Sequence, residues 1–118
     1  MTPTLGSLIL YTGKMDQMAG FYETHFGYAR HQPEGDRVIE LRPPAGGIPL
    51  LLHPAAKGMR QGQVAVKLTF SCDDVEAFCT ESARQGLVFG KIHRAEGYVF
   101  ANAKDPSGNS VSVSGRFA

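Results

Sequence analysis

The stretch DPSGNSVSV (residues 105–113) decides the fold of this 118-residue chain, because it joins a tight turn to a strand with two unlike faces. Asp105, Pro106 and Gly108 occupy the first, second and fourth positions of a type I turn, where these residue types are favoured. Successive side chains of a strand point to opposite faces, so the next residues place valines on one face and serines on the other. The valine face predicts contact with a core, and the serine face needs a different, polar neighbour.

Working outward from this strand, one order of elements occurs twice: a strand, a helix and three strands. In the first half the expected elements are a strand at 5–12, a helix at 14–27, and strands at 28–32, 37–42 and 48–53. In the second half they are a strand at 64–71, a helix at 72–86, and strands at 87–93, 96–103 and 109–115. We expect module 1 at about residues 1–54, a linker at about 55–63 and module 2 at about 64–118. One helix covers only one face of each half's strands, so the other face is available to form a cavity.

Composition excludes several classes of function. Hydrophobic residues make up 42% and charged residues 19%, as in ordinary globular domains. A formal net charge of +1 offers no argument for binding nucleic acid or an anionic membrane. No apolar run approaches the roughly 18 residues of a membrane span, and no basic residue precedes the short apolar stretch at the N-terminus, as a signal peptide would require. We therefore expect a cytoplasmic single domain in which Cys72 and Cys79 are reduced thiols.

The motifs FYETHFGY (21–28), DDVEAF (73–78) and DPSGNSVSV (105–113), together with the doubled element order, resemble the vicinal oxygen chelate superfamily. This group is also called the glyoxalase/bleomycin-resistance/dioxygenase family, and the resemblance covers essentially the whole chain. It implies an α+β fold of two βαβββ modules that form a cupped mixed sheet with the helices on the outer face. Members of this family commonly pair, so the resemblance also implies a homodimer.

Enzymes of this family hold a divalent cation in the cup, with ligands on the first and last strand of each module. Carried over by resemblance, the four positions fall on Ser7, Leu51 (or either neighbouring leucine), Lys67 and Ser112. Leucine is no ligand, a neutral hydroxyl is a poor one, and an ammonium group repels a metal ion. We therefore predict neither a metal nor another cofactor, and we expect the serine face to look into the cup.

Strand alternation extends the resemblance to a set of candidate ligand-binding residues. They share the strand face that would line the cup, and they are Ser7, Tyr11, Leu51, Lys67, Thr69, Tyr98, Phe100, Asn102, Ser110 and Ser112. The opposite, helix-facing set is apolar and comprises Leu8, Leu10, Val66, Leu68, Phe70, Val111 and Val113. Lys67 is the strongest single candidate, as an anchor for a ligand carboxylate or phosphate or, less often, as a base with a shifted pKa. The alternatives without a function are a lysine at a shallow, solvated cup mouth, or one that pairs with an acid such as Glu40.

Three functions remain open. The leading one is metal-independent binding of a polar, neutral or anionic organic ligand, similar to the binding by bleomycin-resistance proteins in drug or xenobiotic resistance. The second is a lyase, isomerase or dioxygenase, with a displaced metal site using His53 and His93 or acid/base chemistry of Lys67 with Tyr11 or Tyr98. The third is a ligand-free interaction subunit. The +1 charge and Lys67 favour a neutral or anionic ligand over a cationic one.

Overall fold

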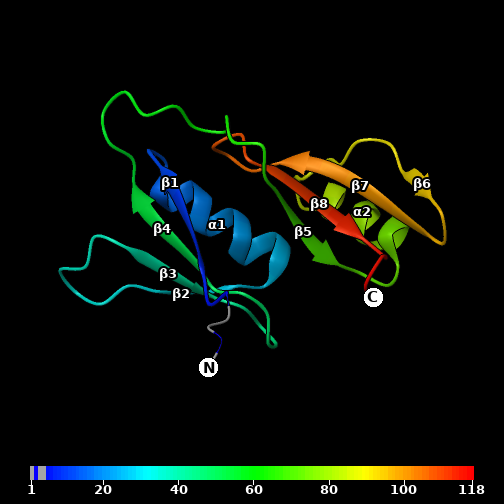
Figure 1. Ribbon diagram of the computed structural model, residues 1–118, viewed down its shortest axis with the longest axis horizontal. Coiled ribbons are helices and arrows are strands. Elements are labelled where there is room, and N and C mark those ends of the chain that lie inside the picture. The colour runs from blue at the N-terminus through cyan, green and yellow to red at the C-terminus, as the bar shows by residue number, and fades with distance from the viewer. Residues whose placement is uncertain (1, 3–4) are drawn as a thin grey trace. The chain divides into compact units, whose positions relative to one another are not determined.

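A computed structural model describes residue 2 and residues 5–118 of the chain, which divides into two compact units, residues 1–61 and 62–118 (Figure 1). Each unit carries a strand, a helix and three further strands in that order, and each builds a four-stranded mixed sheet. The predicted α+β fold of two βαβββ modules is therefore confirmed. No helix in the described part of the chain has the length and apolar character needed to cross a membrane.

The first unit is organised around β4. Its elements are β1 (Leu8–Thr12), α1 (Met15–Phe26), β2 (Ala29–His31), β3 (Ile39–Arg42) and β4 (Leu50–Pro54). The strand order is β1-β4-β3-β2, with β1 and β4 parallel and the other neighbours antiparallel. The helix ends, as predicted, at Gly27, whose φ of 71° is the left-handed conformation that glycine adopts without a steric penalty.

One face of this first sheet forms the core with α1, which contacts β3 and β4. Leu41 and Leu52 of the sheet and Met18 and Tyr22 of the helix are completely buried. On β3 and β4 the buried residues alternate with exposed or half-buried neighbours, because successive side chains of a strand point to opposite faces. The opposite face of the sheet therefore carries a different set of side chains, which includes Tyr11 and Leu51.

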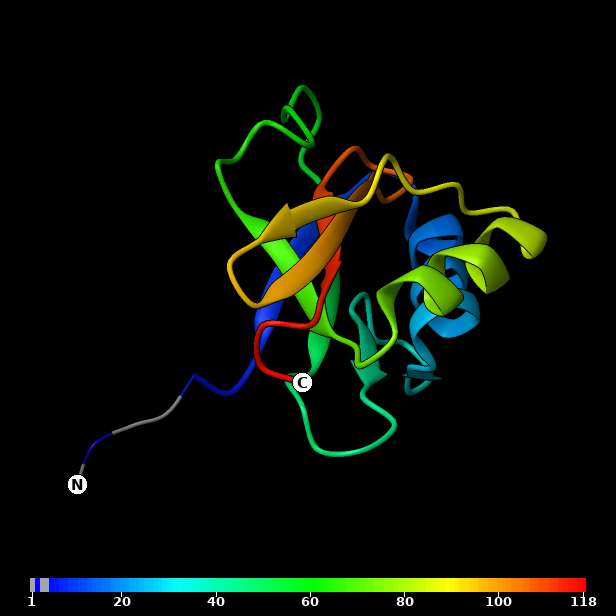
Figure 2. The ribbon, with the colours of Figure 1, turned by 90° about the vertical axis from the view of Figure 1, so that its right-hand side faces the viewer.

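The second unit is organised around β8, the strand that follows the quoted turn. Its elements are β5 (Lys67–Ser71), α2 (Val75–Arg84), β6 (His93–Ala95), β7 (Tyr98–Lys104) and β8 (Ser110–Ser114). The order is β5-β8-β7-β6, with β5 and β8 parallel (Figure 2). The carboxylate of Asp74 caps α2 by accepting a hydrogen bond from the backbone N–H of Ala77 at 3.0 Å.

The predicted turn before β8 is present. The N–H of Gly108 donates to the carbonyl of Asp105 at 2.9 Å, and the φ of Gly108 is 88°. The nearly buried carboxylate of Asp105 accepts three further bonds, one from Ser107 N (3.0 Å) and two from Asn109, through N (2.9 Å) and Nδ2 (2.8 Å). The N–H of Asp105 also donates to the carbonyl of Asn109 at 3.0 Å, so hydrogen bonds in both directions hold the turn from which β8 starts.

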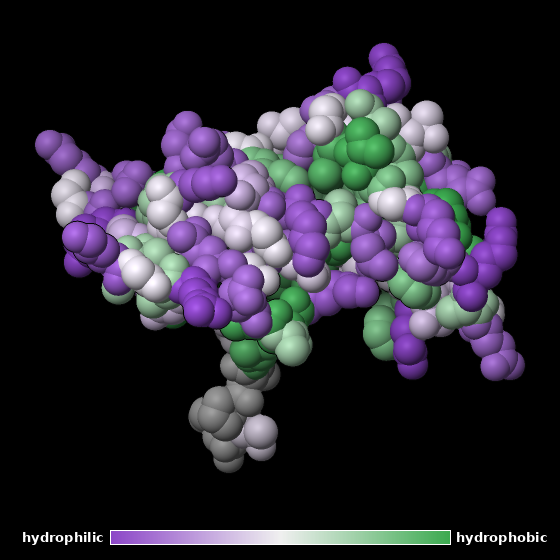
Figure 3. Space-filling view, turned by 90° about the horizontal axis from the view of Figure 1, so that it is seen from above, coloured by the Kyte–Doolittle hydropathy of each residue, from purple (hydrophilic) through white to green (hydrophobic). Residues whose placement is uncertain are grey.

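Three predicted strands were too long or misplaced. The first strand begins at Leu8, so Ser7 precedes it. The fifth begins at Lys67, and Val66, which we expected in the core, is 57% exposed. Residues 87–92 form no strand: Leu87 and Phe89 are buried as loop residues, and the ring of Phe89 packs on that of Phe78 with centroids 6.1 Å apart. Alternating burial in a loop imitates the pattern of a strand. Not every apolar residue is buried: Figure 3 shows hydrophobic residues, in green, at the surface among hydrophilic ones, in purple.

His25 on α1 makes stability depend on pH. Its Nδ1 is buried without a hydrogen-bond partner among the described residues, and its ring lies edge-on to Phe21 with centroids 5.1 Å apart. Burial lowers the pKa of His25 below its ordinary value of 6.5. Between the lowered pKa and 6.5 the unfolded chain binds the proton and the folded chain does not, so stability falls as pH falls through this window.

We therefore expect the wild type to lose more stability between pH 7.5 and pH 5 than a His25→Gln variant loses. Urea unfolding at both pH values measures the difference. An exposed-histidine variant, His31→Gln, serves as the control and is expected to show the wild-type pH dependence. Equal pH dependence of the wild type and His25→Gln would contradict the assignment to His25.

Candidate ligand-binding site

The second sheet has an open face that gathers most of the predicted ligand-binding residues. Cross-strand partners place their side chains on the same face of a sheet. The pairs that define this face are Lys67 with Ser110, Thr69 with Ser112, Ser71 with Ser114, Asn102 with Ser112, Phe100 with Ser114, Lys104 with Ser110, His93 with Phe100, and Ala95 with Tyr98. We call this set of side chains the polar face. The serines of β8 therefore share one surface with Lys67 and the aromatic residues of β7, as their strand patterns predict.

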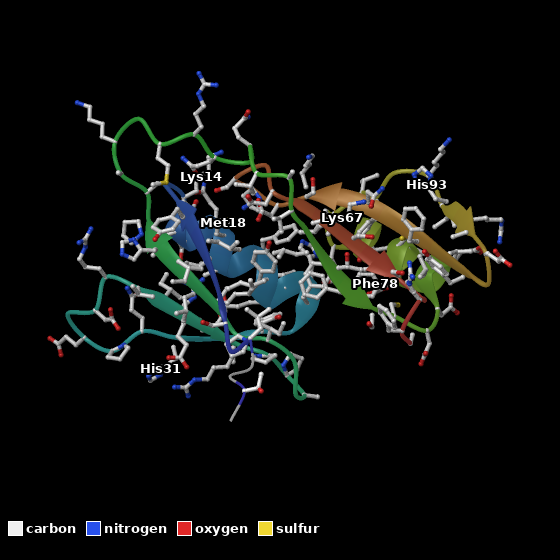
Figure 4. The ribbon with its side chains drawn as sticks, viewed as in Figure 1. Lys14, Met18, His31, Lys67, Phe78 and His93 are labelled. Carbon is white, nitrogen blue, oxygen red and sulfur yellow. The ribbon has the colours of Figure 1, made fainter. Side chains whose placement is uncertain are left out.

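Lys67 has a hydrogen-bond partner on the neighbouring part of this face. Its Nζ donates to Oδ1 of Asn102 at 3.0 Å and lies 5.7 Å from the centroid of the Phe100 ring. From the neighbouring strand β6, the ring of His93 stacks on the Phe100 ring, with centroids 5.0 Å apart and an interplanar angle of 17°. Lys67 and His93 are labelled in Figure 4. Glu40, the acid named as a partner for Lys67, instead pairs with Arg42 at 2.7 Å.

The charge on the polar face has one sign. Lys67 and Lys104 flank Ser110, and Nζ of Lys104 donates to Oγ of Ser110 at 3.0 Å. The residues that the strand register assigns to this face include no aspartate and no glutamate. Within the described chain, Lys67 takes part in none of the ion pairs, so its charge is not neutralised by a carboxylate. A face of this kind attracts anions.

A pocket of about 350 Å³ opens at the other end of β8. It is lined by Thr69, Ser71, Ser114, Arg116 and Phe117. The guanidinium of Arg116 donates from Nη1 to the Tyr98 hydroxyl at 3.3 Å, and its carbon lies 5.6 Å from the centroids of both the Tyr98 and the Phe117 rings. Its backbone N–H donates to Oγ of Ser114 at 3.2 Å. Arg116 and Phe117 were not among the predicted ligand-binding residues, although a cation beside an aromatic residue directly after a serine-rich strand was a usable signal.

Two serines of the polar face are less accessible than their position suggests. Ser112 is 2% exposed and its hydroxyl lies 3.5 Å from the carbonyl oxygen of Val113, while Ser114 is 7% exposed. Both belong to β8, an inner strand whose neighbours on either side carry larger side chains. The hydroxyls therefore form the floor of this surface, and the longer side chains of Lys67, Phe100 and Arg116 rise around it.

The remaining candidates belong to the first unit. Tyr11, Leu51 and His53 share the open face of the first sheet, where the Tyr11 and His53 rings lie 5.1 Å apart. Nδ1 of His53 lies 2.9 Å from the carbonyl oxygen of Pro54. Ser7 directly precedes β1. These residues make a mixed apolar and polar surface of their own.

The donor atoms do not fit the divalent cation that the family resemblance implies. Ser7 and Leu51 in the first unit and Lys67 and Ser112 in the second offer two neutral hydroxyls, an alkyl group and an ammonium. Nζ of Lys67 is already engaged as a hydrogen-bond donor to Asn102. Across residue 2 and residues 5–118, no three His, Cys, Asp or Glu side chains are placed so that they could share a metal ion.

Neither cysteine has the lowered pKa that activates a nucleophilic thiol. Cys72 and Cys79 are free thiols of intermediate burial. Burial raises the pKa of both thiols, and the Cys72 thiol donates a hydrogen bond to the carbonyl oxygen of Asp74 at 3.4 Å. A raised pKa keeps a thiol protonated, and the protonated form is a poor nucleophile.

Comparison with known proteins agrees with this architecture. Residues 4–113 match the sequence model of the Glyoxalase/Bleomycin resistance protein/Dioxygenase superfamily. Among curated proteins, no sequence match to the chain was found.

Several solved structures share the fold over nearly their whole length. An antibiotic-binding protein, TnmS3, from Streptomyces sp. CB03234 is 21% identical with a TM-score of 0.77, over 96% of each chain. An integron cassette protein from V. Cholerae is 23% identical with a TM-score of 0.73, over 97% of this chain and 95% of the other. A lactoylglutathione lyase from Agrobacterium tumefaciens is 23% identical with a TM-score of 0.71, over 96% of this chain and 94% of the other. At these identities the similarity establishes the fold.

Proposed function

Since the chain belongs to the Glyoxalase/Bleomycin resistance protein/Dioxygenase superfamily, we propose that it is a metal-independent binding protein for a small organic anion. The polar face of the second sheet receives the ligand. TnmS3, a protein of similar fold, is an antibiotic-binding protein, which supports the binding of a small organic molecule as a use of this architecture. The role that follows is sequestration of a xenobiotic compound in the cytoplasm.

One observation carries the proposal: on the polar face, the side chain of Lys67 has no carboxylate partner among the described residues and lies beside serine hydroxyls and aromatic rings. Lys67 keeps two of its three N–H donors after the bond to Asn102. Phe100, with His93 stacked on it, offers an apolar surface beside the ammonium group. A few placed polar groups around an apolar surface are what a small-molecule site requires. A metal-dependent reaction has less support, since the donor atoms at the family's metal positions do not fit a divalent cation.

The proposal includes a homodimer. On the first sheet, Ile9 is 50% exposed and Tyr11 45% exposed, and both lie on the face that α1 leaves open. A partner chain that covers this face would remove two large apolar side chains from water, which favours association.

Replacing Lys67 by glutamate tests the proposed function. We expect wild-type protein to bind members of a panel of neutral and anionic aromatic compounds, and Lys67→Glu to bind the anionic ones at least tenfold more weakly. The reason is that the change replaces an attractive charge by a repulsive one beside Phe100. Isothermal titration measures the affinity, and a thermal melt checks that the exposed substitution leaves the fold intact.

Lys57→Glu is the matched control, because it makes the same charge change at an exposed lysine outside both sheets. It is expected to keep wild-type affinity. Unchanged binding of anions by Lys67→Glu would remove Lys67 from the site, and conversion of a bound compound into product would replace binding by catalysis as the function.

A further inference from the structure

The second sheet has a second cationic position, Arg116, at the far end of β7 from Lys67. The two side chains are held by residues of the same strand: Lys67 bonds to Asn102, and Arg116 bonds to Tyr98. Asn102 and Tyr98 lie four residues apart and point to the same face, because four is an even number of strand positions. The strand therefore separates two cationic groups along one surface.

Arg116 retains the capacity to bind an anion. The guanidinium group has five N–H donors, of which the structure assigns one, on Nη1, to the Tyr98 hydroxyl. In the part of the chain that the structure describes, Arg116 joins no ion pair. It lines the pocket of about 350 Å³ beside the hydroxyl-bearing Thr69, Ser71 and Ser114. Guanidinium and hydroxyl donors converging on one pocket are well suited to a carboxylate.

An apolar platform lies between the two cationic groups. Phe100 occupies the position on β7 midway between Tyr98 and Asn102, and its ring lies 6.3 Å from that of Tyr98. Lys67 approaches this ring from one side of the site, and Arg116 contacts the Tyr98 ring on the other. His93 stacks on one face of Phe100, so an apolar middle section of a ligand contacts the remaining surface of the Phe100 and Tyr98 rings while its ends reach toward the two cations.

From this arrangement we propose that the ligand is a rod-shaped dianion, with an aromatic body on Phe100 and Tyr98, one carboxylate on Lys67 and the other on Arg116. This proposal rests on the proposed function, which needs only the Lys67 end. Asn102 and Tyr98, which hold the two cationic groups, are separated along the extended strand by about 13 Å, with the rings of Phe100 and Tyr98 between these groups. A ligand with carboxylates at opposite ends of one benzene ring directs its charges toward both cations, whereas carboxylates on neighbouring ring positions point the same way.

Three probes of related structure test the proposal. They are benzene-1,4-dicarboxylate, its isomer benzene-1,2-dicarboxylate, and benzoate. The two dicarboxylates have equal charge and composition, so only the direction of their carboxylates differs. We expect the wild type to bind the 1,4 isomer at least tenfold more tightly than the 1,2 isomer or benzoate, as measured by chemical-shift titration.

Removal of the second cation should abolish that preference. In Arg116→Gln the 1,4 isomer is expected to fall to the affinity of benzoate, whereas benzoate itself, held at Lys67, changes by less than threefold. Arg94→Gln is the matched control, since Arg94 lies on the opposite face of β6 and pairs with Glu76 at 3.6 Å. It is expected to bind all three probes as the wild type does.

The outcomes separate this proposal from the proposed function. If Lys67→Glu weakens the binding of every anion and Arg116→Gln changes none of the affinities, the rod-shaped dianion is wrong and the proposed function stands. If Arg116→Gln weakens binding and Lys67→Glu does not, the Arg116 site stands and the Lys67 anchor is wrong. Failure of the wild type to bind any of the three probes, or equal binding of both isomers, also overturns the dianion proposal.

Discussion

Replacing Leu52 by alanine is expected to destabilise the protein by about 2 to 5 kcal/mol, the range measured for truncation of fully buried leucines. Leu52 lies on β4, next to Leu10 on β1 and Ile39 on β3, and its side chain is completely buried. The truncation removes contacts with the core and leaves a cavity under α1, which packs on β3 and β4. Denaturant unfolding followed by circular dichroism measures the loss as a shift of the midpoint.

Leu51→Ala provides the internal control, because it makes the same chemical change one residue away. Leu51 points to the open face of the sheet and is only partly buried, so we expect a loss of about 1 kcal/mol or less. This comparison measures the strand register directly, since a shift by one residue would exchange the two results. Equal losses for both variants would contradict the register of β4.

The second large effect is expected for Asp105→Ala, at about 3 kcal/mol. The nearly buried Asp105 carboxylate accepts hydrogen bonds from the backbone N–H of Ser107 and from the backbone and side-chain N–H groups of Asn109. Alanine leaves these donors without their acceptor, and each hydrogen bond to a charged group is worth about 1.5 to 3 kcal/mol. The loss concentrates at the turn that leads into β8, so amide hydrogen exchange of β8 and its neighbours should rise with the global loss of stability.

Two variants calibrate this result. Asp105→Asn keeps one carbonyl oxygen as an acceptor but presents an amide to the Nδ2 donor of Asn109, so we expect an intermediate loss. Asp73→Ala removes an exposed carboxylate before α2 and is expected to change stability by about 0.5 kcal/mol or less. A loss for Asp105→Ala as small as that for Asp73→Ala would show that the turn contributes little to the stability of the second unit.

The face on which a strand residue lies was predictable from the sequence, because side chains alternate between the two faces from one residue to the next. Val111 and Val113 are buried, and their serine neighbours share a face with Lys67 and Asn102, as alternation predicts. Gly27 and Gly108 mark a helix end and a turn for an equally local reason: each takes a positive φ. The assignment of the polar-face residues to ligand binding stays a prediction.

Loops and long side chains were not predictable in this way. Leu87 and Phe89 alternate with exposed residues as in a strand, yet they are buried in a loop because Phe89 packs on Phe78 of α2. The sequence carries no local sign that distinguishes these two cases. The partner of Lys67 was equally hidden, since Asn102 is 35 residues away. Glu40, named as one alternative partner, pairs with Arg42, which lies two residues away on the same strand.

The sequence by itself determined the succession of elements in the two βαβββ modules and the alternation of faces along β5, β7 and β8, because turns, caps and strand alternation depend on neighbours along the chain. Only the tertiary structure decided which side chains meet across strands: Lys67 with Asn102 and Phe100, and Arg116 with Tyr98. Such contacts depend on strand order and on the reach of flexible side chains. Because they join residues far apart in the chain, they become visible only when the sheet is assembled.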